Sequence, residues 1–240
     1  MNVQLQRDML DLGDGSIFRY AVMCPERESA QRKPLIIVLH PGWAGELPSP
    51  NYGEQFLASL FAPALLTTGA YIVAPDCPSP AWNHPRSVNA ISVLLDYFLE
   101  EHAISGGAVS LVGYSAGGWG AWYLLQQNPG RFSSSVMIAT LPIMDPVERF
   151  EDNFAVLSDV LNERKNEWLY RVPDVPLFII HSRDDEIFPI EMADNAYMAL
   201  KDDQRDVAYR TVEGVGHFHG AGYVDALKEA APWLLKVWAT

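Results

Sequence analysis

The amino-acid sequence predicts an α/β fold in which helices cover both faces of a mostly parallel sheet. Short apolar runs rich in β-branched residues recur along the chain, and residues 35–39 (Leu-Ile-Ile-Val-Leu) are the clearest example. Such continuous runs are typical of strands that are buried on both faces. Segments with apolar residues at helical spacing lie between the runs, and strands that alternate with helices favour a parallel sheet.

The elements can be assigned in order along the chain. Residues 1–34 are expected to contain an opening hairpin, because a Gly-Asp-Gly turn signal at 13–15 precedes the alternating segment 16–23. Further strands are expected at residues 35–39, 71–74, 108–112, 135–139, 177–181 and 207–212. Helices are expected at residues 55–68 with a kink at Pro63, and at 87–102, 119–127, 190–200 and 222–238.

Residues 141–174 interrupt this alternation, since prolines and charged residues punctuate them. We interpret the segment as a small insertion near the functional site. The whole chain, residues 1–240, is therefore predicted to form one domain, and its length suits one α/β domain.

Composition and charge narrow the function classes. The formal net charge of −13 disfavours binding to nucleic acid or to an anionic membrane. No apolar signal-peptide segment opens the sequence, and no apolar stretch reaches the roughly 18 residues of a membrane span. We expect a cytoplasmic protein without membrane insertion, either monomeric or homodimeric. Cys24 and Cys77 are too few for a disulfide framework and are expected to be two separate buried thiols.

The most informative stretch follows the expected strand at 108–112. Residues 113–117 (Gly-Tyr-Ser-Ala-Gly) fit the pattern G-x-S-x-G around Ser115, and a predicted helix follows them. A strand, a sharp turn and a helix are the context of a nucleophile elbow, in which the serine hydroxyl projects from the sheet. The flanking glycines prevent clashes between helix and strand, and the helix N-terminus adds positive potential. The alternative is a glycine-rich turn whose serine only caps the helix.

A serine nucleophile needs a histidine to take its proton and an acid to orient that histidine. In this type of fold both follow the serine, first the acid and then the histidine. The loop after the expected strand 177–181 offers three candidate acids: Asp184, Asp185 and Glu186. Either aspartate could instead be a solvated loop carboxylate or a helix cap.

Two histidines, His217 and His219, follow the last expected strand. We favour His217, because the small Gly216 before it lets a tight loop approach the serine. A His-x-His pair could also bind a metal ion. No cluster of carboxylates or cysteines with ligand spacing accompanies the pair, so neither a metal site nor a cofactor is expected.

An oxyanion hole would need two backbone N–H donors. Ala116, directly after the serine, is the first candidate. The second should follow the strand at 35–39, where Pro41 has no N–H to offer. We favour Trp43 over Gly42, because the glycine allows a turn that points the next amide inward. Trp43 and Trp82 occupy loops at strand ends, where such sheets bind ligands, and are expected to contact substrate.

Together these motifs resemble the α/β-hydrolase superfamily, and within it the phospholipase/carboxylesterase and dienelactone-hydrolase-like serine esterases. The matching segments are residues 39–42, 113–118, 128–132, 181–189 and 214–217. The resemblance implies an α/β-hydrolase fold with Ser115, Asp185 and His217 as a catalytic triad. Asp185 is favoured over Asp184 because Ile-Phe-Pro stands at 187–189, as two apolar residues and a proline follow the acid in related enzymes.

The resemblance also implies an activity, the hydrolysis of small to medium carboxylic esters through an acyl-enzyme. The same triad could serve a peptidase or amidase, and a non-catalytic binding protein could share the fold. Two departures are visible: Pro41 stands where most relatives have glycine after the histidine, and Ser115 replaces the cysteine nucleophile of dienelactone hydrolases proper.

Overall fold

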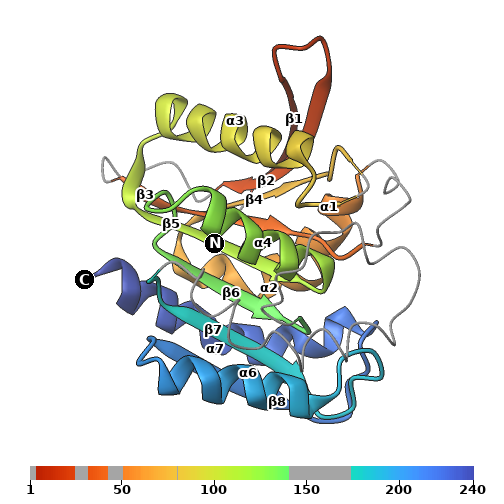
Figure 1. The fold of residues 1–240 in the computed structure, drawn as a ribbon. Coiled ribbons are helices and arrows are strands. Elements are labelled where there is room, and N and C mark those ends of the chain that lie inside the picture. The colour runs from red at the N-terminus through yellow and green to blue at the C-terminus, as the bar shows by residue number, and fades with distance from the viewer. Residues whose placement is uncertain (1–3, 25–31, 43–50, 80, 141–173) are drawn as a thin grey trace.

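The computed structural model describes residues 4–24, 32–42, 51–79, 81–140 and 174–240 (Figure 1). Among these residues, eight strands form one sheet in the order β1-β2-β4-β3-β5-β6-β7-β8. The strands are β1 (Gln4–Asp11), β2 (Ile17–Cys24), β3 (Lys33–Leu39), β4 (Tyr71–Pro75), β5 (Ile104–Tyr114), β6 (Ser134–Ile138), β7 (Leu177–Ser182) and β8 (Val207–Val212).

The direction of the strands agrees with the sequence prediction. β1 and β2 form the expected antiparallel hairpin, and β2 also pairs antiparallel with β4. Every pair from β4 through β3, β5, β6 and β7 to β8 is parallel. The mostly parallel sheet is therefore confirmed, and its carboxyl-terminal edge is where the loops that follow β3, β5, β6 and β7 begin.

Helices cover both faces of the sheet (Figure 1). The elements are α1 (Tyr52–Phe56), the π-helical η1 (Leu57–Phe61), α2 (Ala62–Leu65), the 3-10 helix η2 (Leu66–Thr68), α3 (Pro85–Glu101), α4 (Ala116–Gln127), α6 (Ile190–Asp202), the 3-10 helix η5 (Gly220–Tyr223) and α7 (Val224–Trp238). One apolar core joins α3, α4 and α6 to the sheet. A second core joins η1, α2 and α7 to the opposite face.

The predicted helix at 55–68 is broken into several segments. Pro63 lies in the first turn of α2, and the π-helical turn η1 directly precedes it. Proline has no N–H and its ring clashes with the carbonyl four residues back, so the regular helical ladder cannot pass through this point. The sequence therefore predicts a break in the helix at Pro63, but it does not predict the π-helical turn that precedes α2.

The predictions for the cysteines, for the insertion and for Trp43 have different outcomes in the structure. Cys77 is buried, but Cys24 is only half-buried, so the expectation of two buried thiols was wrong for Cys24. The predicted insertion at 141–174 and the predicted donor Trp43 lie outside the described residues, except for Asp174. No helix in the described ranges has both the length and the apolar character needed to cross a lipid bilayer.

Candidate active site

Ser115 occupies a sharp turn between the end of β5 and the start of α4. Its backbone angles are φ 53° and ψ −118°, a conformation that residues with a side chain rarely adopt. Its N–H donates to the carbonyl oxygen of Ile138 at 2.9 Å, and its own carbonyl accepts from the Gly118 and Trp119 amides at 2.9 and 3.2 Å. The turn is thus held by the neighbouring strand β6 and by the first turn of α4.

The two glycines of the G-x-S-x-G pattern permit this turn. A Cβ atom on Gly113 would overlap the carbonyl group of Gly117, and a Cβ on Gly117 would overlap the carbonyl oxygen of Leu39 at the end of β3. The N-terminus of α4 therefore lies directly on the ends of β5 and β3, at a distance that only glycine allows.

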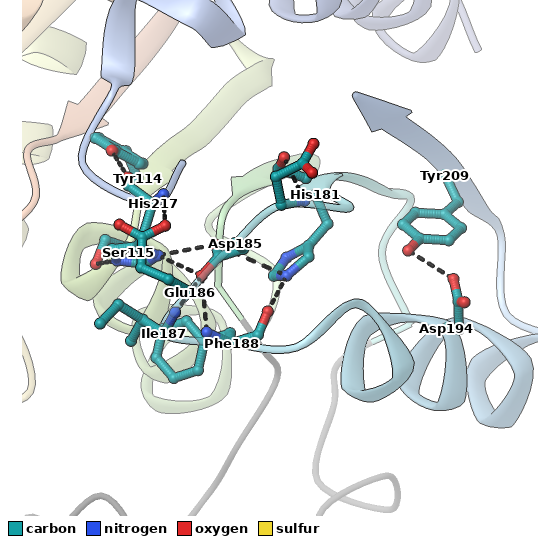
Figure 2. Close-up of polar contacts among 12 residues, drawn as sticks. Tyr114, Ser115, His181, Asp185, Glu186, Ile187, Phe188, Asp194, Tyr209 and His217 are labelled. Atoms are coloured by element: carbon teal, nitrogen blue, oxygen red, sulfur yellow. Dashed lines mark hydrogen bonds and ion pairs between the residues drawn. The ribbon is translucent and has the colours of Figure 1, made fainter. Parts of the chain in front are cut away.

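The structure brings together three side chains that the sequence analysis selected (Figure 2). The Oγ atom of Ser115 lies 2.8 Å from Nε2 of His217, and Nδ1 of His217 lies 2.8 Å from Oδ2 of Asp185. Because the Asp185 carboxylate can only accept, Nδ1 carries the proton and donates it to Asp185. Nε2 is then free to accept the hydroxyl proton of Ser115, which is the arrangement that activates a serine.

The competing residues make other contacts. The carboxylate of Asp184 accepts a hydrogen bond from the Gly214 amide at 2.6 Å. The backbone of His219 lies in a turn, in which its N–H donates to the Gly216 carbonyl at 3.1 Å. Of the residues that competed in the sequence, Asp185 and His217 are therefore the two whose side chains are aligned with Ser115.

Asp185 is an enclosed carboxylate with several donors around it. Its side chain is 0% exposed, and its Oδ1 accepts the amides of Ile187 and Phe188 at 2.9 and 2.7 Å. Burial by itself raises the pKa of Asp185, but the hydrogen bonds from His217, Phe188 and Ile187 together outweigh it and lower that pKa below its ordinary value. Asp185 is therefore ionised at neutral pH and can stabilise a positive imidazole beside it.

His181, to which the sequence analysis gave no functional role, supports the loop that carries Asp185. The imidazole is fully buried, and its Nε2 donates to the carbonyl oxygen of Phe188 at 2.7 Å. Burial lowers the pKa of His181, so the ring is neutral and has one N–H to donate. The bond fixes the backbone just after Asp185, whose amides hold that carboxylate.

Of the candidate oxyanion donors, Ala116 is the first residue of α4 and directly follows Ser115. The first amides of a helix have no partner within the helix, so this N–H is available to a ligand at the turn. Gly42 is exposed just after β3, and the loop that contains it leaves the sheet beside Gly117. The choice between Gly42 and Trp43 depends on Trp43, which the structure does not describe.

Trp82 does not lie where the sequence analysis expected it. The side chain is 3% exposed, and its Nε1 donates to the His40 carbonyl oxygen at 3.0 Å. A Cβ on Gly120 of α4 would overlap Trp82, so the indole packs directly on that helix. The prediction that Trp82 contacts substrate is therefore corrected: the residue is part of the core, because its loop folds inward over α4.

Two neighbours of His217 escaped the sequence analysis as contributors to the site. Oε2 of Glu186 accepts the His217 N–H at 2.7 Å, and the phenol of Tyr114 donates to the His217 carbonyl oxygen. The sequence indicates Glu186 only as an alternative acid and Tyr114 only as the variable residue of the G-x-S-x-G pattern. Both contacts are to main-chain atoms, which every residue carries, so the sequence holds no signal for them.

The described residues hold no group of three or more His, Cys, Asp or Glu side chains arranged for a metal ion. The chemistry of the site can be described from its serine, imidazole and carboxylate. A serine hydroxyl aligned with an imidazole, which is itself aligned with a buried carboxylate, can attack an electrophilic carbonyl carbon.

Comparisons with known proteins agree with the fold. A family model described as alpha/beta hydrolase fold matches residues 36–160. Among solved structures, a thermostable esterase superposes with a TM-score of 0.67 at 20% identity, covering 97% of this chain and 62% of that one. A ferulic acid esterase gives 0.70 at 17% identity, with 99% and 100% covered. A puromycin-hydrolyzing peptidase of Mycobacterium tuberculosis gives 0.66 at 17% identity, with 99% and 40% covered.

The solved structures and the family model support different conclusions about this chain. This chain spans 62% of the thermostable esterase and 40% of the peptidase, and all three identities are low enough to establish the fold alone. A search of curated proteins found no match. The family model, in contrast, covers more than half of the 240 residues and includes the turn at Ser115. This chain therefore belongs to the α/β-hydrolase fold family.

Proposed function

We propose that this protein is a serine hydrolase that cleaves carboxylic esters of small to medium size. One observation carries the proposal: the hydroxyl of Ser115 lies within hydrogen-bond distance of His217, whose other ring nitrogen is bound to the buried carboxylate of Asp185. The similarity to structures named as esterases supports an ester as the substrate. The net charge of −13 supports a small-molecule substrate over nucleic acid.

The proposed reaction has two steps. In the first, Oγ of Ser115 attacks the ester carbonyl carbon while Nε2 of His217 takes the hydroxyl proton and then passes it to the leaving alcohol. In the second, His217 takes a proton from water, the resulting hydroxide attacks the acyl-serine, and the proton returns to Ser115 as the carboxylic acid leaves. Asp185 stays ionised and stabilises the imidazolium of His217 in both steps.

The negative charge that develops on the carbonyl oxygen needs donors. We propose that the Ala116 amide is one, and that Trp43 or Gly42 in the loop after β3 supplies the other. Each such donor typically contributes about 10²–10³ in kcat. Trp43 is also proposed as a substrate contact.

The test compares wild-type protein with the variant Ser115→Ala. Wild-type protein should hydrolyse p-nitrophenyl acetate and should be labelled at Ser115 by a fluorophosphonate, whereas Ser115→Ala should lose about 10³-fold or more of the activity and all of the labelling. Retention of a tenth of the wild-type activity would overturn the assignment of Ser115.

A second comparison separates the substrate classes. The structural likeness to a puromycin-hydrolyzing peptidase favours one alternative, an amidase or peptidase that uses the same three residues. We expect kcat/KM for p-nitrophenyl acetate to exceed that for peptide anilides. The reverse order would support the peptidase, and wild-type protein that neither turns over nor becomes labelled would support a non-catalytic binding protein.

A further inference from the structure

The main chain of His217 is held on both sides by side chains. The N–H group donates to Oε2 of Glu186 at 2.7 Å, and the carbonyl oxygen accepts the phenol of Tyr114 (Figure 2). We propose that Tyr114 and Glu186 are positioning residues, which keep the imidazole of His217 within reach of Ser115 and Asp185. This inference rests on the proposed function.

The two residues come from the same loops as the partners of the imidazole. Tyr114 directly precedes Ser115 at the end of β5, and Glu186 directly follows Asp185 in the loop after β7. The side chains of Ser115 and Asp185 contact the ring of His217, while those of their chain neighbours contact its backbone. Ser115 and Tyr114 on one side, and Asp185 and Glu186 on the other, therefore each contact His217 at two points, so its main chain cannot shift relative to Ser115 or Asp185 without breaking a backbone contact.

The surroundings of Tyr114 keep its hydroxyl protonated, so that it can donate to the His217 carbonyl oxygen. It is 2% exposed, and its ring lies among those of Phe56, His217 and Tyr223. Burial raises the pKa of Tyr114 above its ordinary value, so the phenol keeps its proton at neutral pH. Because His217 itself is 3% exposed, its carbonyl oxygen would lose its hydrogen-bond partner in a nearly closed site if the hydroxyl were removed.

Glu186 is exposed, yet its carboxylate points back at the His217 loop. The hydrogen bond from the His217 amide lowers the pKa of Glu186, so the side chain is a charged acceptor at neutral pH. A Cβ on Gly216 would lie 2.9 Å from Oε2 of Glu186, closer than real Cβ atoms approach. Gly216 therefore leaves the space through which Glu186 reaches the amide, and this adds a second reason for glycine at that position.

Loss of either contact to the His217 backbone should affect the chemical step and not the binding of substrate. His217 must accept a proton from Ser115 and deliver it to the leaving group, so it needs the correct position in the transition state more than in substrate binding. A displacement of about 1 Å in a catalytic group can lower the rate by about 10²-fold. Loss of either backbone contact should therefore lower kcat and leave KM nearly unchanged.

The chain offers a matched control. The carboxylate of Asp184, like that of Glu186, is exposed and accepts a hydrogen bond from a backbone amide of the same loop, but the donor is Gly214. Substitution of Asp184 by alanine tests general support of the loop, whereas substitution of Glu186 tests support at His217 itself. Glu186→Gln keeps an oxygen acceptor without the charge and so tests the bond.

The experiment measures kcat and KM for p-nitrophenyl acetate and the rate of fluorophosphonate labelling in wild-type protein and in four variants. We expect Glu186→Ala and Tyr114→Phe each to lower kcat and the labelling rate about tenfold with KM within about twofold. Glu186→Gln should recover most of the loss. Asp184→Ala should stay within about twofold of wild type in both constants.

Circular dichroism and thermal unfolding establish that each variant is folded before its kinetics are compared. Should Tyr114→Phe fail to fold, the three variants at 184 and 186 still decide the question. The inference is overturned if Glu186→Ala matches wild type, if it changes KM alone, or if Asp184→Ala loses as much activity as Glu186→Ala. Wild-type protein without ester hydrolysis and labelling would overturn the proposed function as well, and that failure is visible before any variant is measured.

Discussion

Ser115 has a backbone conformation that costs free energy, and its neighbourhood holds a second such residue. In the described part of the chain, positive φ angles at non-glycine residues occur at Asn51, Ser115, Ala139 and Gln204. Ser115 and Ala139 follow the adjacent strands β5 and β6, and the amide of each donates to the next strand, to Ile138 and Ile180 at 2.9 Å. Each strained residue costs roughly 1–3 kcal/mol, which the surrounding sheet must offset. Strain of this kind gathers at functional sites.

At the residue scale, the alignment of side chains predicts which aspartate, 184 or 185, and which histidine, 217 or 219, is needed for activity. Asp185→Asn and His217→Ala should each lower kcat by about three to four orders of magnitude, because each breaks the line of hydrogen bonds to Ser115. Asp184→Asn should stay within about twofold of wild type, and His219→Ala within about tenfold. Steady-state kinetics with p-nitrophenyl acetate measure all four, and a reversed order within either pair would show that the wrong neighbour had been selected.

At the scale of elements, the contact of α4 with β3 and β5 decides where Ser115 sits. Gly117→Ala would place a methyl group against the backbone of Leu39, which cannot rotate away as a side chain could. We expect the free energy of unfolding to fall by about 3 kcal/mol, together with a loss of activity as the turn shifts. Urea denaturation measures the first effect.

Gly106, near the start of β5, provides the control for this substitution. A Cβ there would meet nothing within 4 Å, and its φ angle lies outside the left-handed region. Gly106→Ala should leave stability within about 0.5 kcal/mol of wild type, or raise it slightly, and should not change activity. Equal losses from the two substitutions would mean that close packing of α4 is not the cause.

At the scale of the whole molecule, a buried histidine links stability to pH. His40 is 2% exposed, its Nε2 accepts the Cys77 amide at 3.0 Å, and its Nδ1 donates to the Pro41 carbonyl at 2.6 Å. Burial lowers the pKa of His40 from 6.5 to about 4, although the nearby Asp76 acts in the opposite direction. The ring is therefore neutral in the folded protein at neutral pH.

The sign of the effect follows from proton binding. Between pH 6.5 and about 4 the unfolded chain binds a proton at His40 that the folded chain does not, so stability falls as the pH drops through this window. The loss from His40 should reach about 3 kcal/mol at most. His40→Gln keeps an acceptor near the Cys77 amide, and its stability should decline less steeply than that of wild type between these pH values. Parallel curves for the two proteins would contradict the prediction.

The alternation of strands and helices could be predicted from sequence because burial depends on side-chain type. Residues 35–39 are all apolar because both faces of β3 are covered, so every side chain in the run is buried. The mostly parallel sheet, the opening hairpin and the position of most elements follow from this relation. The start of α4 was predicted three residues too late, at 119 in place of Ala116, because small residues carry little periodic signal.

At the site, the sequence predicts residues whose role requires a particular type of side chain. It does not predict contacts that depend on the direction in which a side chain points. Ser115 and His217 follow from the motif, the chain order and the small Gly216, and Asp185 follows from the resemblance to related enzymes. The structure brings these three side chains together. Other features depend on how separate segments of the chain meet in space. They are the inward position of Trp82 and the hydrogen bonds of Tyr114 and Glu186 to the backbone of His217. Backbone amides and carbonyls are alike in nearly every residue, so only the tertiary structure decides which side chains reach them.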